Sequence, residues 1–234
     1  MNLESKHMKK GVIIFHNNIK KIYKDYWIDK CINSIINQTD NEVTFYEINY
    51  GGDDYSVLEN YPDIKKIFWS EKLTNYAEAM NFILDKAFDD GCDYVFNTNL
   101  DDFYSPNRFK YQLDMIIKEG LDIVSSDFCY IEETMINNVE TDIITRHMNI
   151  EKNNIKTHLN NKHNVIAHPS VCYSKNFWLD KKNRYDITKT PEEDLDLWID
   201  SINRGYKFGI HNETLLFYRI HNKQISNRKK ENVY

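Results

Sequence analysis

Glycine and proline are scarce in this 234-residue chain, which has 7 and 4 copies of them. The segment after the first apolar run reads Phe15-His16-Asn17-Asn18, so the GxGxxG loop of a dinucleotide-binding fold is absent. A GxxxxGK[ST] phosphate loop is also absent, and a methyltransferase would need glycines at the same place. The sequence therefore excludes folds in which a glycine-rich first turn cradles phosphate.

Paired cysteines and long apolar runs are missing as well. Cys31, Cys92, Cys129 and Cys172 form no CxxC pair, which argues against a zinc knuckle and fits a reducing compartment. The chain contains no run of 18 apolar residues, so no transmembrane helix is predicted, and residues 1–10 lack the apolar core of a signal peptide. We therefore expect a cytoplasmic protein. Asparagine occurs 28 times, which is typical of an AT-rich genome such as a viral or low-GC bacterial one.

The chain also has no excess of positive charge. Lysine and arginine number 30 against 36 acidic residues, a net charge of −6, which argues against a nucleic-acid-binding protein. Hydrophobic residues make up 41% of the chain, enough to bury a core, and the length suits one α/β domain. The sequence leaves the oligomeric state open.

The first hundred residues alternate between strand and helix patterns. Apolar residues recur at helical spacing from Ile28 to Ile36 and from Tyr76 to Ala87. This order predicts a Rossmann-like, doubly wound, mainly parallel sheet flanked by helices in a single domain. Short apolar runs typical of buried strands occur at 11–15, 43–48, 66–69 and 94–96.

The second half gives weaker signals. Ser105 and Pro106 predict the start of a helix that ends at Gly120, and Thr190 to Glu193 form a capping box for another helix. Residues 131–163 are polar, so we expect a poorly ordered excursion over the active-site face, with one strand-like piece near 143–144. Further strands are expected at 122–130, 165–173, 206–210 and 215–220.

These patterns also predict the domain boundaries. Residues 1–9 are expected to be a disordered extension or tag remnant, and 222–234 a polar tail. The domain itself is placed at 10–221, with a nucleotide-binding half at 10–102 and an acceptor half at 103–221.

Polar residues follow the predicted strands where a doubly wound sheet binds ligands, beyond the carboxyl ends of its strands. The richest of these segments is Asn97 to Asp102. Carboxylate oxygens there suit Mg²⁺ or Mn²⁺, which can bridge a diphosphate. Alternatively, Asp101 and Asp102 precede a helix and complement its dipole.

Several motifs in order along residues 10–226 resemble those of family 2 glycosyltransferases with the GT-A fold. Asp101 to Arg108 resembles the family's DDxxxPxR stretch, and Glu193 to Trp198 is very similar to its EDYDLW stretch. The other matching segments are Val12 to Asn18, Ser34 to Gln38, Asn75 to Asn81, Gly205 to Phe208 and Tyr218 to His221.

The resemblance implies a metal and donor site. The family's DxD motif falls on Asn99-Leu100-Asp101, so Asp101 would bind Mn²⁺ or Mg²⁺ while the first carboxylate has become an amide. The family's donor-site acid falls on Asn49, again an amide. His221 is implied as a metal ligand, and Arg219 as a bidentate partner of phosphate. Asn99 would face ribose or the metal. The remaining implied substrate or nucleotide contacts are His16, Asn18, Gly51, Asn75, Leu100, Asp102 and, near the acceptor, His168.

The resemblance also implies inverting transfer of a sugar from a nucleoside diphosphate, UDP first of all, to a glycan or other hydroxyl acceptor. Asp194 matches the family's general base, with Glu193 beside it. Alternatively, these acids merely populate a first helical turn. A catalytically lapsed nucleotide- or carbohydrate-binding module is the second hypothesis, favoured by Asn49 and Asn99. A nucleotidyltransferase is the third, although it should show a glycine-rich first loop.

Overall fold

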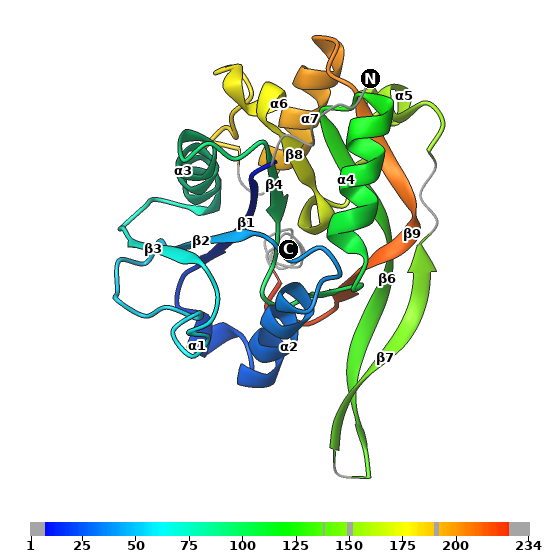
Figure 1. The fold of residues 1–234 in the computed structure, drawn as a ribbon. Coiled ribbons are helices and arrows are strands. Elements are labelled where there is room, and N and C mark those ends of the chain that lie inside the picture. The colour runs from blue at the N-terminus through cyan, green and yellow to red at the C-terminus, as the bar shows by residue number, and fades with distance from the viewer. Residues whose placement is uncertain (1–7, 138, 149–151, 190–191, 225–234) are drawn as a thin grey trace, which may run out of the picture.

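The computed structural model describes residues 8–137, 139–148, 152–189 and 192–224. Their strands form one mixed sheet in the order β3-β2-β1-β4-β8-β6-β9-β5, with β7 paired to β6. Helices lie on both faces of the sheet (Figure 1). The predicted α/β, doubly wound architecture is confirmed.

The first four strands along the sheet are parallel, as predicted. They are β1 (Lys10–His16), β2 (Thr44–Asn49), β3 (Lys66–Ser70) and β4 (Tyr94–Asn97). Their apolar runs are continuous because helices cover both faces, so that successive residues such as Ile13 and Ile14 are both fully buried.

The remaining strands make the sheet mixed. They are β5 (Phe103–Tyr104), β6 (Ile123–Ile136), β7 (Val139–Met148), β8 (Cys172–Ser174) and β9 (Phe208–Arg219). Strand β6 runs parallel to β9 and antiparallel to β7 and β8.

Seven α-helices lie in the described residues. They are α1 (Ile19–Ile22), α2 (Asp25–Ile36), α3 (Tyr76–Asp89), α4 (Arg108–Glu119), α5 (Ile155–Asn160), α6 (Lys175–Leu179) and α7 (Glu193–Asn203). Within the same residues, none of these helices has the length and apolar character needed to cross a membrane.

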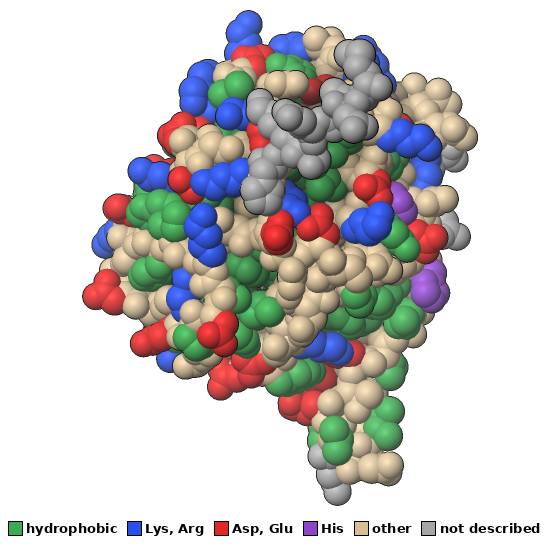
Figure 2. Space-filling view, in the orientation of Figure 1, with side chains coloured by type: hydrophobic (Ala, Val, Ile, Leu, Met, Phe, Trp, Pro, Cys, Tyr) green, Lys and Arg blue, Asp and Glu red, His purple; other side chains and the backbone are tan. Residues whose placement is uncertain are grey.

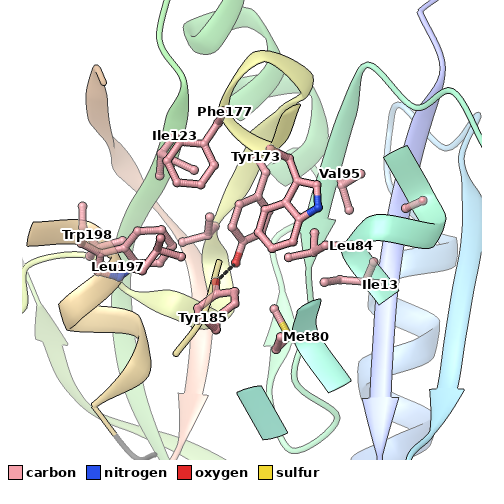
Figure 3. Close-up of a cluster of buried hydrophobic side chains, with 14 of the residues drawn as sticks. Ile13, Met80, Leu84, Val95, Ile123, Tyr173, Phe177, Tyr185, Leu197 and Trp198 are labelled. Atoms are coloured by element: carbon pink, nitrogen blue, oxygen red, sulfur yellow. Dashed lines mark hydrogen bonds between the residues drawn. The ribbon is translucent and has the colours of Figure 1, made fainter. Parts of the chain in front are cut away.

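Two apolar cores lie on opposite faces of the sheet. One contains Leu84 of α3 and Trp198 of α7, together with residues of α6 (Figure 3). The other contains Ile32 of α2 and Leu113 of α4. The apolar stripe of each helix therefore faces the sheet, as the 3.6-residue periodicity predicts.

The starts of two helices differ from the prediction. Helix α4 begins at Arg108 rather than Pro106, because the amide of Phe109 donates to Oε1 of Gln38, 3.0 Å away, and Ser105 does not cap the helix. Helix α7 begins at Glu193, and Glu192 at its N-cap position makes no side-chain cap. Thr190 and Pro191 of the predicted capping box lie outside the described residues.

Two strand predictions were wrong, and so was the expectation of an irregular segment from residue 131, although the strand-like piece near 143–144 does lie in β7 (Val139–Met148). Residues 131–148 are not irregular: β6 and β7 form a long hairpin that projects from the body, and Figure 2 shows hydrophobic side chains on it. Residues 165–173 are mostly a loop with a 3-10 turn at His168–Ser170. One strand, β9, replaces the two expected at 206–220, with irregular pairing where it passes Asp127.

The predicted domain boundaries remain a prediction. Strand β1 begins at Lys10, one residue after the predicted extension ends. Most of that extension (1–7) and most of the predicted tail (225–234) lie outside the described residues.

Candidate active site

The carboxyl ends of the parallel strands meet at one edge of the sheet. His16 of β1 lies beside Asn49 of β2, which lies beside Ser70 of β3. The amide of Tyr50 donates to the carbonyl of His16 at 2.9 Å, which joins the first two loops. Strand β4 ends at Asn97, where the segment with Asp101 begins. The structure therefore brings together most of the strand ends that the sequence singled out.

Asp101 and His221 are in contact although 120 residues separate them in the chain. Nε2 of His221 lies 2.9 Å from Oδ2 of Asp101. The His221 ring packs against Trp27 and Tyr23, with centroids 5.0 and 5.8 Å apart. The two residues predicted to bind metal thus lie side by side, with aromatic rings packed against His221.

The side chains around Asp101 fit a divalent cation that also takes some of its ligands from the substrate. Within the described residues, Oδ1 of Asp101 and Oδ1 of Asn99 are buried and accept no hydrogen bond. No cluster of three or more His, Cys, Asp or Glu is found among those residues. Mg²⁺ is commonly held by one or two carboxylates together with substrate phosphates and water. The carboxylate of Asp101 and the amide oxygen of Asn99 match that pattern, whereas the imidazole of His221 is a ligand more typical of transition metals.

Asp102 and Leu100 belong to the fold around this segment. Asp102 is 1% exposed, and its Oδ1 accepts a hydrogen bond from the amide of Arg219 at 2.9 Å. Burial, and then the neighbouring Asp101, raise the pKa of Asp102 well above its usual range. Leu100 is buried in the core beneath α2 and α4. The predicted substrate contacts of these two residues gain no support from their positions.

Arg219 is already engaged in the structure. Its Nε donates to the carbonyl of Asp101 at 2.8 Å, and both terminal nitrogens donate to the carboxylate of Asp142 on β7. The side chain is 1% exposed. Bidentate binding of phosphate by Arg219, as predicted, would require this ion pair to break.

The amide at position 49 holds its own loop. Nδ2 of Asn49 donates to Asp53 and to the carbonyl of Tyr55, and Oδ1 accepts from the amide of Gly51 at 3.1 Å. Asn49 is 1% exposed. A carboxylate could not make the two donor contacts, so the change from acid to amide is explained by the fold of residues 49–55.

His16, Gly51 and Asn18 lie around the same loop. Nε2 of His16 lies 2.8 Å from the buried carboxylate of Glu47, which also accepts from the amide of Val57. A Cβ on Gly51 would come within 2.5 Å of Oδ1 of Asn17, so the glycine allows the first two loops to approach closely. Asn18 has a positive φ of 52° and donates to Asn17.

Asn75 caps helix α3 and holds the loop that leads to α7. Its Oδ1 accepts from the amide of Glu78 at 3.1 Å, and its Nδ2 donates to the carbonyl of Ile187 at 2.7 Å. Asn81, one turn further on, makes two hydrogen bonds with the backbone of Tyr185. The two asparagines of the family-like motif therefore position a loop, and the predicted substrate contact of Asn75 gains no support.

His168 lies at the centre of a tyrosine cluster. Nδ1 of His168 is 3.0 Å from the hydroxyl of Tyr76, and Nε2 is 2.9 Å from that of Tyr185. Tyr185 in turn lies 2.6 Å from the hydroxyl of Tyr173 (Figure 3). Burial lowers the pKa of His168, although the negative charge of Asp194 acts to raise it. The neutral imidazole is thus held by hydroxyls on both sides.

Asp194 lies at the edge of this cluster, in the first turn of α7. It is half-buried, and its carboxylate accepts from Asn164 Nδ2 at 2.9 Å and from the amide of Leu195 at 2.7 Å. The charges of Glu193 and Asp194 both act on Tyr76. Glu193 is 6% exposed.

One hydrogen bond links the acceptor-side cluster to the Asp101 segment. Nδ2 of Asn97 donates to the carbonyl of His168 at 2.9 Å. The half-buried carboxylate of Asp194 and the candidate metal ligands near Asp101 therefore belong to connected parts of the fold, which is the arrangement that acid–base and metal-assisted chemistry need.

Sequence reasoning missed several residues around both clusters. Tyr76 lies on the apolar face of α3, Trp27 is buried in the first turn of α2, and Tyr185 lies in a loop, so no sequence pattern marks their hydroxyl and ring contacts. Asp142 lies in a polar segment where no pattern distinguishes it from its neighbours. Lys30, which also binds Asp142, lies on the polar side of α2.

The family comparison agrees with this geometry. A sequence model described as glycosyl transferase family 2 matches residues 12–182. The chain belongs to glycosyltransferase family 2, and its fold is GT-A.

Two curated relatives carry glycosyltransferase names. The O-antigen biosynthesis glycosyltransferase WbnJ of Escherichia coli is 28% identical over 209 residues, which cover 85% of this chain and 76% of WbnJ. An uncharacterized glycosyltransferase of Methanocaldococcus jannaschii is 29% identical over 144 residues, which cover 60% of this chain and 47% of that protein.

Solved structures show the same fold. Staphylococcus aureus TarS in complex with UDP-GlcNAc superposes with a TM-score of 0.68 at 15% identity and covers 94% of this chain. TarS in complex with UDP gives a TM-score of 0.64, also at 15% identity, and covers 92%. In both cases the chain spans 61% of the TarS chain.

Proposed function

We propose that this protein is an inverting glycosyltransferase that moves a sugar from a nucleoside diphosphate, UDP first of all, to an acceptor hydroxyl. The observation that carries this proposal is the contact between Asp101 and His221 beside Asn99, at the carboxyl ends of the parallel strands. Membership of family 2 and the UDP and UDP-GlcNAc complexes of TarS support the choice of donor.

The residues of the Asp101 segment would bind the donor diphosphate. Asp101, Asn99 and His221 would hold Mn²⁺ or Mg²⁺, which stabilises negative charge on the leaving diphosphate when it is bound. The aromatic rings of Tyr23 and Trp27 cover His221 and limit access of water to the site.

Asp194 would act on the acceptor. Its carboxylate takes the proton of the acceptor hydroxyl as that oxygen attacks the anomeric carbon from the face opposite the diphosphate. Asn164 and the amide of Leu195 fix the carboxylate for this step. The His168 cluster, whose Tyr76 and Trp198 rings lie 5.9 and 6.0 Å from the imidazole, would support this region from the core, because Trp198 is fully buried.

The first test compares Asp101→Asn with wild type in calorimetric titrations of UDP, with Mn²⁺ and with EDTA. We expect Mn²⁺ to strengthen UDP binding by wild type and to have little effect on the variant. The matched control is Asp114→Asn, which removes an exposed carboxylate on α4 that pairs with Lys110. Equal UDP affinity of the wild type in both conditions would contradict the metal role.

The second test measures release of UDP from a panel of UDP-sugars, with and without candidate glycan acceptors. Acceptor-dependent turnover would support the transferase assignment. UDP binding without turnover of any donor would instead favour the lapsed binding module.

A further inference from the structure

The β6–β7 hairpin carries two acidic residues on the face that meets α2. Glu133 and Asp142 are register partners on the two strands. Glu133 accepts from Tyr26 at 2.7 Å and from the indole of Trp27 at 2.8 Å, and Lys24 also pairs with it. Asp142 pairs with Lys30 at 2.7 Å and with Arg219. Hydrogen bonds and ion pairs therefore hold the hairpin against helix α2, whose Trp27 packs on His221.

Arg219 joins this hairpin to the Asp101 segment. Its main-chain amide binds the carboxylate of Asp102, and its Nε binds the carbonyl of Asp101, while its two terminal nitrogens bind Asp142. Its guanidinium also lies 4.8 Å from the ring of Trp27. A single side chain thus contacts the hairpin, helix α2 and the segment that carries the candidate metal ligand.

The Asp142–Arg219 pair is shielded from water. The two side chains are 4% and 1% exposed. A buried guanidinium that loses its bidentate partner is expected to pair with another carboxylate, because leaving a buried charge unpaired costs free energy. Two alternatives are Asp101, whose carbonyl the guanidinium already contacts, and Asp102, whose charge already acts on it. Either new pairing would turn the Asp101 segment away from its present geometry.

We propose that Asp142 is a positioning residue for the donor site, which keeps Arg219 away from the carboxylate of Asp101 and so leaves that carboxylate free for the cation. This proposal rests on the proposed function, since it assigns Asp142 to the same donor site. It also gives the hairpin a role, because the hairpin supplies the carboxylate that pairs with Arg219.

The test is Asp142→Asn, an isosteric change that removes the charge. Loss of a residue that orients a metal ligand typically lowers metal affinity by about 10- to 100-fold. We expect the UDP affinity of the variant measured with MnCl₂ to decrease by a factor in that range, while its UDP affinity measured with EDTA stays close to that of wild type. A merely structural role would lower both affinities together.

Glu140→Gln is the matched control. Glu140 lies on the same strand, two residues from Asp142, but it is 42% exposed and pairs with the exposed Lys24. We expect its Mn²⁺-dependent UDP affinity to equal that of wild type. Should Asp142→Asn not fold, Asp142→Glu carries the test: it keeps the charge but displaces it by one methylene, so we expect a smaller loss in the same direction.

The outcomes separate the two proposals. A wild-type protein that binds UDP no better with Mn²⁺ counts against the proposed function, and with it against the role of Asp142. A wild type that does show the Mn²⁺ effect, beside a folded Asp142→Asn or Asp142→Glu protein with the same effect, overturns the role of Asp142 alone.

Discussion

Replacing Asp194 by asparagine separates catalysis from stability in this fold. The substitution keeps the shape of the side chain but removes its ability to take a proton from the acceptor. Loss of a general base typically lowers the rate by about 10²–10⁴-fold. At about 1.4 kcal/mol for each factor of ten, this corresponds to about 3–6 kcal/mol of activation free energy.

The expected change in the free energy of unfolding is smaller. Loss of an exposed or half-buried acid from a first helical turn costs about 0.3–1 kcal/mol. An asparagine oxygen can still accept from the amide of Leu195, but its Nδ2 would then face Nδ2 of Asn164, whose own oxygen is held by the amide of Ile166. One hydrogen bond is therefore lost, which costs about 0.5–1.5 kcal/mol.

The assay measures kcat for transfer, with a donor and acceptor found by screening, together with UDP affinity and urea unfolding. We expect turnover to fall by at least two orders of magnitude and UDP affinity to stay within a factor of about two. The control is Asp196→Asn, because Asp196 is exposed, lies two residues away and is 3.8 Å from Lys189. Near-wild-type turnover of a folded Asp194→Asn protein would refute the reasoning and transfer the role of base to Glu193.

Three further predictions concern the fold. Burial lowers the pKa of His168, so as the pH falls the unfolded chain protonates this histidine before the folded protein does, and the free energy of unfolding should decrease below about pH 6.5. In His168→Gln this decrease should be smaller. A variant with the same pH profile of stability as wild type would contradict the lowered pKa of His168. Leu84→Ala in the core should lower the free energy of unfolding by about 2–5 kcal/mol, whereas Ile143→Ala, on the hairpin and 41% exposed, should change it by less than about 0.5 kcal/mol in urea titrations. Amides in the paired segment 128–136 should exchange slowly without any ligand, because β6 pairs with β7 throughout this segment and with β9 as far as Ile131. Exchange as fast as that of a free loop would restore the expectation of a poorly ordered segment.

The sequence by itself determined the parallel half of the sheet. The runs at 11–15, 43–48, 66–69 and 94–96 are short and apolar, and helical periodicity follows the first and the third of them. Each became a strand within one or two residues of its predicted ends. Local pattern is sufficient there because burial on both faces leaves few polar residues to obscure it. The family is likewise determined by the order of motifs along the chain, and the match of the family model over residues 12–182 confirms it.

The tertiary structure decided what the polar residues do. Asn49 and Asn75 were predicted to contact substrate, yet their amides hold loops, because the partners that satisfy them are backbone groups brought near by folding. Asp142 and Arg219 are 77 residues apart, and Asp101 and His221 are 120 residues apart. Hydrophobic periodicity records which face of an element is buried, but it carries no information on which buried charges meet. Those pairings follow from the desolvation cost of each charge, which is set only when the strands and the hairpin have come together.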